Sequence, residues 1–189
     1  MISSLPININ DLLHFRGVES ARVEFKQSWD EQTTALQVLK TICAFANDFY
    51  NVSGGYIVIG VGENDGVAVL PPLGLNPNKL DRIQKWIRGN CNRIEPVVQP
   101  ILSPQVVEEK FILVIRVLGS DTRPHQAPVS FSGSEKAYYV RLGAETVEAK
   151  GKMNVPLLRF APNYWACALK YLLMIAAPYR LRSMNCAQL

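Results

Sequence analysis

Basic side chains gather in one segment of the chain, residues 79–94, at a spacing suited to nucleic acid. The segment carries one acid, Asp81, and five cations: Lys79, Arg82, Lys85, Arg88 and Arg93. Clustered Lys and Arg bind nucleic acid because they neutralise backbone phosphates and release counterions. Trp86, in the same segment, offers a ring on which a base could stack. The alternative is that these residues are simply the solvated face of an amphipathic helix.

Common nucleotide and metal motifs are missing from the sequence. Gly151-Lys152 is followed by Met153, and no glycine stands five residues earlier, so the phosphate-cradling P-loop is absent and ATP is not an expected cofactor. The three glycines within residues 60–66 are spaced as GxGxxxG, which departs from the dinucleotide-binding GxGxxG. The cysteines and histidines are too scattered for a structural zinc site. We therefore expect no cofactor from these motifs.

The composition is that of a folded chain with a mild basic bias. Of the 189 residues, 48% are apolar and 19% are charged, which excludes an intrinsically disordered chain. The net charge of +4 permits contact with nucleic acid but does not demand it. The N-terminus lacks the pattern of a signal peptide, and no apolar run reaches the ~20 residues that span a bilayer. We expect reduced cysteines, a cytoplasmic protein and no membrane partner.

Hydrophobic periodicity predicts the elements that must position the basic segment. Apolar residues recur at helical spacing in 33–49 and 79–94, and a shorter helix is expected from Asn8 or Asn10 to Phe15. Asp65-Gly66 predicts a hairpin turn. Strands are expected at 18–26, 56–61, 97–107, 111–118 and 137–142, with a loop at 123–134 and with 143–149 leaving the sheet. This order favours an α+β fold with a mixed β-sheet and two main helices.

Residues 151–189 differ in character from the rest, so the sequence predicts a domain at 1–150 and a C-terminal extension at 151–189. Residues 163–177 are apolar with one charge, Lys170, and this stretch is too short to span a membrane. We expect a short helical extension that either docks on the domain or forms a homo-oligomer contact, because an exposed apolar helix tends to aggregate. The second possibility would make the chain a protein-interaction or dimerisation module.

Four segments and one threonine together resemble a known family. They are residues 19–26 (ESARVEFK), 41–47 (TICAFAN), 54–61 (GGYIVIGV), 138–143 (YYVRLG) and Thr146. Their order and spacing, over about residues 8–150, resemble the Schlafen AlbA-type domain. That domain is also labelled a divergent AAA or DNA-binding domain, and it occurs in bacterial transcriptional regulators and RecG-related proteins.

The resemblance implies an α+β domain related to the nucleic-acid-binding Alba fold. The leading hypothesis is therefore a DNA-binding module of a bacterial transcriptional regulator, with DNA preferred over RNA as the partner. Arg141 and Arg123 would extend the basic patch, although Arg141 could instead pair with Glu145 or Glu148. Longer bacterial members continue into a larger C-terminal region, and residues 177–182 match its start poorly. We expect residues 151–189 to be a truncated or diverged remnant of that region.

The resemblance also implies a second hypothesis, a metal-dependent endoribonuclease. Some eukaryotic Schlafen proteins cleave RNA with three carboxylates. Glu19 and Glu24 match the first two by position, and the third corresponds to Glu63 or Asp65, because the turn is one residue longer here. Such a site would bind Mg²⁺ or Mn²⁺, the metal would activate water, and Lys26 would stabilise the developing charge. The alternative is that Glu24 and Lys26, which share one face of a strand, form an ordinary ion pair.

Overall fold

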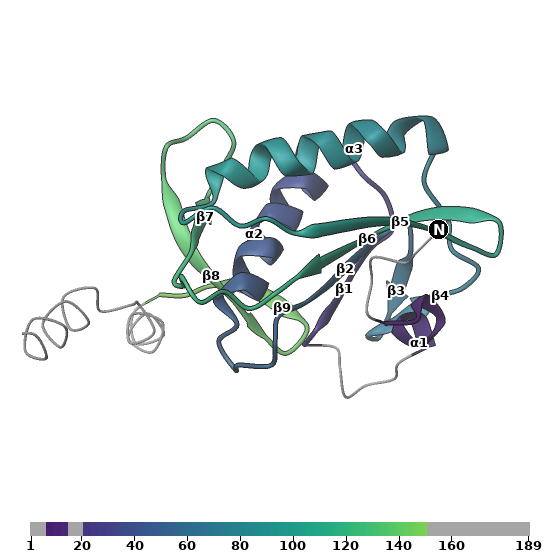
Figure 1. Ribbon diagram of the computed structural model, residues 1–189, viewed down its shortest axis with the longest axis horizontal. Coiled ribbons are helices and arrows are strands. Elements are labelled where there is room, and N and C mark those ends of the chain that lie inside the picture. The colour runs from purple at the N-terminus through teal and green to yellow at the C-terminus, as the bar shows by residue number, and fades with distance from the viewer. Residues whose placement is uncertain (1–6, 15–20, 151–189) are drawn as a thin grey trace, which may run out of the picture.

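The computed structural model describes residues 7–14 and 21–150, which form the α+β fold that the sequence predicts (Figure 1). Two helices and a small three-stranded sheet lie on one face of a mixed four-stranded sheet. The predicted C-terminal helical extension at 151–189 falls outside the described residues, and so does Glu19. Within those described ranges, every helix is too short or too polar to cross a bilayer.

The four-stranded sheet has the strand order β1-β2-β6-β5. Its members are β1 (Val23–Lys26), β2 (Gly55–Ile59), β5 (Ile101–Val107) and β6 (Lys110–Val117). β1 and β2 run parallel, whereas β2–β6 and β6–β5 are antiparallel. Parallel neighbours need a crossover connection, and α2 (Thr33–Asn47) supplies it. The pairing of β5 with β6 confirms the two adjacent strands expected from the sequence.

A second sheet covers the other side of α2. It has the order β7-β8-β9 and consists of β7 (Gln126–Pro128), β8 (Lys136–Leu142) and β9 (Glu145–Glu148). Two expectations are wrong here: residues 123–134 contain a strand, and 143–149 turn back at Gly143, whose φ is +57°, to pair with β8 instead of leaving the sheet. α2 consequently lies between two sheets, and every side chain from Thr41 to Asn47 is buried.

The opposite face of the four-stranded sheet is covered by α1 (Ile9–His14) and by a hairpin. The hairpin joins β3 (Gly62–Asn64) to β4 (Val67–Val69). Asp65 and Gly66 both have positive φ, as a tight two-residue turn requires, so the predicted Asp-Gly hairpin is confirmed. A second core cluster forms here from side chains of α1, β1, β2 and β6: Leu12, Leu13, Val23, Phe25, Val58 and Val114.

The basic segment forms a helix, α3 (Pro77–Asn90), followed by a short 3-10 turn at Cys91–Arg93. Asn76 caps its start by accepting a hydrogen bond from the Asn78 backbone N–H, and Pro77 takes the first position, where a missing N–H costs nothing. Leu80, Ile83 and Ile87 are buried in the same core cluster as α2. The opposite face of α3 is therefore open to solvent.

One buried amide ties α2 to the second sheet. The side chain of Asn47 donates to the backbone oxygens of His125 (3.0 Å) and Tyr139 (2.8 Å) and accepts from the His125 N–H (2.6 Å). Asn47 is fully buried, so none of these bonds can be replaced by bulk water. The amide therefore satisfies three backbone groups that an apolar residue would leave unpaired.

Asn47→Ala should lower the free energy of unfolding by about 3 kcal/mol. The substitution removes the hydrogen-bond partner of three buried backbone groups, and each unsatisfied group costs about 1–3 kcal/mol, partly recovered where the structure relaxes. Urea denaturation measures the change. The exposed Asn92 offers a control, since Asn92→Ala should shift stability by about 0.5 kcal/mol or less. Similar losses in the two variants would contradict the role given to Asn47.

Burial of His125 should make the stability of the domain depend on pH. The Nδ1 of this side chain donates to the Pro96 backbone oxygen (2.6 Å). Burial lowers the pKa of His125 below its ordinary 6.5, and the hydrogen bond to Pro96 opposes this only in part. The unfolded chain thus takes up the proton more readily, so stability is full above about pH 6.5 and declines as the pH falls. Urea midpoints at pH 7.5 and 5.5 should show the decline, and His125→Gln should reduce it. The control His14→Gln should leave the decline in stability unchanged. If the decline is equally large in His125→Gln, His125 is not its source.

Candidate functional site

The Glu24 carboxylate on β1 lies between two cations. Its Oε1 is 2.7 Å from Lys26 Nζ, and its Oε2 is 2.6 Å from Arg141 Nη1 on β8. Glu24 and Lys26 are two residues apart on the strand, so both project from the face that carries α2. The ordinary ion pair expected for Glu24 and Lys26 is therefore present, with Arg141 as a third member.

Arg141 is almost completely buried, and its partners explain how a permanent charge is held there. Its Nη1 also donates to Thr146 Oγ1 (3.1 Å), its Nε donates to the Ala21 backbone oxygen (3.4 Å), and its guanidinium lies 5.2 Å from the centre of the Phe45 ring. A buried cation needs a counterion and hydrogen bonds, and Glu24 is the counterion. Arg141 thus joins the second sheet to β1.

The ion pairs of Glu24 do not favour the predicted metal site. Both oxygens of Glu24 contact cations, and two positive charges surround one negative charge. Divalent cations are held by clustered anionic or neutral oxygen ligands, which is the opposite charge balance. In the described part of the chain, no group of three His, Cys, Asp or Glu side chains is placed to hold a metal ion.

The other predicted carboxylates lie apart from Glu24. Glu63 is exposed on β3 and pairs with Ala68 across the hairpin, and Ala68 packs against the second core cluster. Directly opposed residues of an antiparallel pair project to the same side, so Glu63 belongs to the α1 side of the main sheet. Asp65 is exposed in the hairpin turn. Among the described members, the structure brings Glu24 and Lys26 together and leaves Glu63 and Asp65 on the hairpin.

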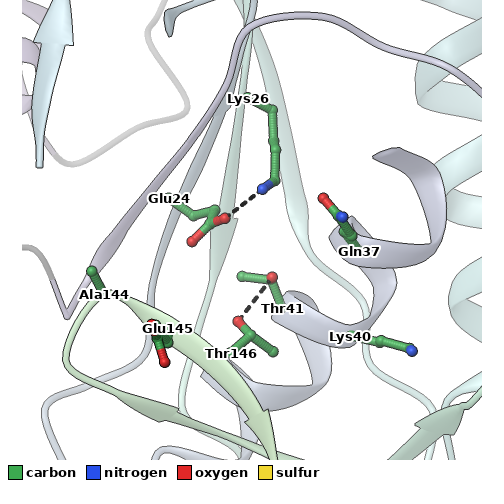
Figure 2. A pocket seen from close by; sticks show the side chains of 8 residues that line it. All are labelled: Glu24, Lys26, Gln37, Lys40, Thr41, Ala144, Glu145 and Thr146. Atoms are coloured by element: carbon green, nitrogen blue, oxygen red, sulfur yellow. Dashed lines mark hydrogen bonds and ion pairs between the residues drawn. The ribbon is translucent and has the colours of Figure 1, made fainter. Parts of the chain in front are cut away.

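A pocket of about 350 Å³, lined mainly by residues with polar or charged side chains, opens beside Glu24 (Figure 2). Side chains of β1, α2 and the β8–β9 hairpin line it: Glu24, Lys26, Gln37, Lys40, Thr41, Ala144, Glu145 and Thr146. The hydroxyls of Thr41 and Thr146 share a hydrogen bond of 3.0 Å between α2 and β9. The pocket exists because the C-terminal half of α2 is buried between the two sheets while Gln37 and Lys40 in its N-terminal half remain accessible. Sequence reasoning missed Gln37, Lys40 and Thr41 as lining residues, because they belong to a helix whose signal was purely hydrophobic.

The exposed face of α3 carries four of the predicted nucleic-acid-binding residues: Lys79, Arg82, Lys85 and Arg88. Arg82 is 2.8 Å from Glu31, and Lys85 is 2.7 Å from Asp81 one turn earlier. Ion pairs between such exposed side chains contribute little, about 0–1 kcal/mol, and exchange readily for other partners. The four cations therefore remain available to an anionic surface.

The other predicted binding residues have structural contacts. Trp86 makes T-shaped contacts with Trp29 (5.3 Å between ring centres) and Phe131 (5.6 Å), and the three rings pack, partly buried, against the core cluster. Arg93 donates to the Phe131 backbone oxygen (2.9 Å) and lies over the Phe131 ring. These contacts hold the C-terminal end of α3 against the segment that joins β7 to β8.

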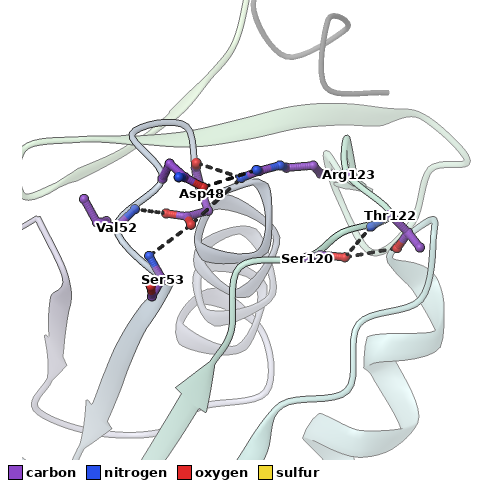
Figure 3. Close-up of polar contacts among 7 residues, drawn as sticks. Asp48, Val52, Ser53, Ser120, Thr122 and Arg123 are labelled. Carbon is purple, nitrogen blue, oxygen red and sulfur yellow. Dashed lines mark hydrogen bonds and ion pairs between the residues drawn. The ribbon is translucent and has the colours of Figure 1, made fainter. Parts of the chain in front are cut away.

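Arg123 likewise supports the backbone, at the turn that follows α2. The Asp48 carboxylate accepts from the N–H groups of Val52 (2.8 Å) and Ser53 (3.0 Å), and Arg123 donates to the Asp48 backbone oxygen (3.1 Å) (Figure 3). Asp48 has a left-handed φ of +41°, which ends α2 two residues before the predicted end. The signal for this turn was present in the sequence, since Asp, Asn, Ser and Gly dominate residues 48–55.

Comparison with known proteins adds one family and two structures. The family model described as Schlafen, AlbA_2 matches residues 19–150. The chain resembles the DIP2311 protein of Corynebacterium diphtheriae at 16% identity with a TM-score of 0.48, covering 71% of this chain and 26% of that one. It also resembles the N-terminal domain of a "Putative ATP-dependent DNA Helicase RecG-related Protein" from Nitrosomonas europaea at 27% identity and a TM-score of 0.48, covering 68% and 83%. The chain thus spans about a quarter of the Corynebacterium protein. A search of curated proteins gave no match.

The contacts of Glu24 predict a large effect on stability. Glu24→Ala should lower the free energy of unfolding by about 3 kcal/mol, because it leaves the buried Arg141 without its carboxylate partner. Urea denaturation of Glu24→Ala and of the exposed control Glu63→Ala tests this, and the control should change by about 0.5 kcal/mol or less. A carboxylate held in a cluster of like charges would behave differently, since its removal would leave stability unchanged or raise it.

Proposed function

The chain belongs to the Schlafen, AlbA_2 family, a family related to nucleic acids, and from this premise we propose that it is a nucleic-acid-binding module whose α3 contacts backbone phosphates. The observation that carries the proposal is the exposure of Lys79, Arg82, Lys85 and Arg88 along one helix. Their electrostatic contact with phosphates is independent of sequence and supplies most non-specific affinity.

The length and rigidity of α3 suit a phosphate backbone. Lys79 and Arg88 are nine positions apart, which is about 13.5 Å along the helix axis and about half a turn around it, so the four cations form a band that winds across the exposed side of α3. The buried residues of α3 fix the helix backbone that carries this band of cations, so little backbone ordering is needed on binding. In the part of the chain that the structure describes, Lys79 and Arg88 have no carboxylate within ion-pairing distance.

We propose duplex DNA as the partner, in the setting of a bacterial transcriptional regulator. Proteins that bind single strands usually stack bases on accessible aromatic rings, and sequence-specific recognition of RNA mostly targets unstacked bases in the same way. Trp86 is partly buried in an aromatic cluster with Trp29 and Phe131, which disfavours that mode at α3. A rigid helix with a band of exposed cations instead favours contact with the backbone of a double helix.

The test pairs two double variants of equal charge. Lys79→Glu/Arg88→Glu changes α3, whereas Lys110→Glu/Lys150→Glu changes exposed lysines elsewhere, and each lowers the formal net charge from +4 to zero. The wild-type protein should retard labelled duplex DNA in a native gel, with an affinity that falls steeply with salt. The α3 variant should bind at least about tenfold more weakly, with the salt slope reduced by about two, and the control should keep most of its affinity.

Three results would overturn this proposal. Equal losses in the two variants would mean that net charge, not α3, governs binding. The absence of any shift with the wild-type protein would exclude the module itself. The same incubations with transfer RNA, in Mn²⁺ or in EDTA, test the metal-dependent endoribonuclease, and metal-dependent cleavage that is lost in a folded Glu24→Gln variant would establish that function instead.

A further inference from the structure

We infer that the pocket between β1, α2 and the β8–β9 hairpin binds the phosphate group of a nucleotide, either free or at the end of a strand. The inference rests on the proposed function for its choice of a nucleotide as the carrier of the phosphate. It is otherwise independent of α3, because the residues that line the pocket come from other elements. It assigns an anion to a place where the sequence suggested a metal ion.

The charge of the pocket favours an anion. Glu24 is the counterion of the buried Arg141, so these two charges cancel. The remaining charged side chains at the pocket are two cations, Lys26 and Lys40, and one acid, Glu145, which is exposed at the rim. In the described chain, no carboxylate lies within ion-pairing distance of Lys40, whose ammonium is 5.2 Å from the centre of the Tyr139 ring. Burial raises the pKa of Tyr139 to about 12, so this ring stays neutral beside the cation.

The pocket also gathers hydrogen-bonding side chains from three elements. Lys26 uses one N–H on Glu24 and retains two more. Figure 2 shows Lys26 and Gln37 pointing toward each other, with the hydroxyls of Thr41 and Thr146 below them and Lys40 leading away along the rim. Ammonium, amide and hydroxyl groups are common ligands of phosphate oxygens. A metal ion in this pocket would face the ammonium group of Lys26.

The dimensions exceed what a phosphate alone requires. A volume of about 350 Å³ is at the lower end of the range for small-molecule sites. The opening therefore has room for a phosphate and for part of the attached sugar. Three separate elements form the walls, so the site is concave rather than a flat patch. A phosphate monoester on a nucleoside matches this size and charge.

The test uses inorganic phosphate, AMP and adenosine in isothermal titration calorimetry with the full chain. AMP and phosphate should bind, and adenosine should not. Lys26→Met should weaken AMP by about tenfold, because a charge-assisted hydrogen bond is lost. Glu145→Gln should strengthen AMP by about threefold, because a rim acid no longer repels the phosphate. The controls Lys110→Met and Glu109→Gln alter exposed residues of the β5–β6 turn and should leave AMP affinity unchanged.

A second arm distinguishes the two sources of phosphate. Oligonucleotides with and without a 5′-phosphate are used as competitors of AMP. If the phosphorylated strand competes better, and Lys26→Met removes this advantage, the ligand of the pocket is the phosphate at a strand end. If Lys26→Met weakens AMP binding but the wild-type protein does not shift duplex DNA in a native gel, the phosphate site is supported and the proposed function is wrong. Duplex binding that depends on α3, with neither AMP nor phosphate bound, overturns the pocket alone. Mn²⁺ binding that becomes tighter in Lys26→Met would also overturn it.

Discussion

The burial of α2 between two sheets is the constraint on which the rest of the domain depends. A helix that loses solvent on both sides must satisfy every polar group within the protein, and the amide of Asn47 does this for the backbone at His125 and Tyr139. The second sheet is thereby fixed on α2, and the β8–β9 hairpin is held beside β1. The pocket near Glu24 is a consequence of this three-layer arrangement, because its walls belong to different layers.

The buried pair of Glu24 and Arg141 sets the chemistry that the pocket can support. A carboxylate in a depression ordinarily suggests a metal ligand or a general base. Here the charge of Glu24 is neutralised by the Arg141 guanidinium, which is even more deeply buried, and Lys26 contacts the second carboxylate oxygen. The role of Glu24 can therefore be assigned only when its ion-pair partners are known. Charge balance, more than residue identity, decides between a cation site and an anion site.

Local patterns predicted the parts of this fold that local interactions determine. The Asp65-Gly66 hairpin, the paired strands around residues 108–110 and the basic helix follow from turn chemistry and periodicity. β7 and β9 were missed because a strand with Pro128 and a polar strand of four residues carry no apolar alternation. The partner of Glu24 could not be predicted either, since Arg141 is 117 residues away in sequence. Trp86 gave the signal of an accessible ring because its neighbours Trp29 and Phe131 are 57 and 45 residues away in sequence.

The sequence separation of Glu24 and Arg141 also has a consequence for how the domain is made. All four strands of the main sheet and both large helices are complete once synthesis reaches Val117, whereas the strands that close the pocket are added last. Contacts between such distant segments form late, because a long loop must close first. A nascent chain would therefore acquire the cationic surface of α3 before it acquires a neutralised Glu24. The cationic surface of α3 and the closed pocket are then formed at different times as well as in different places.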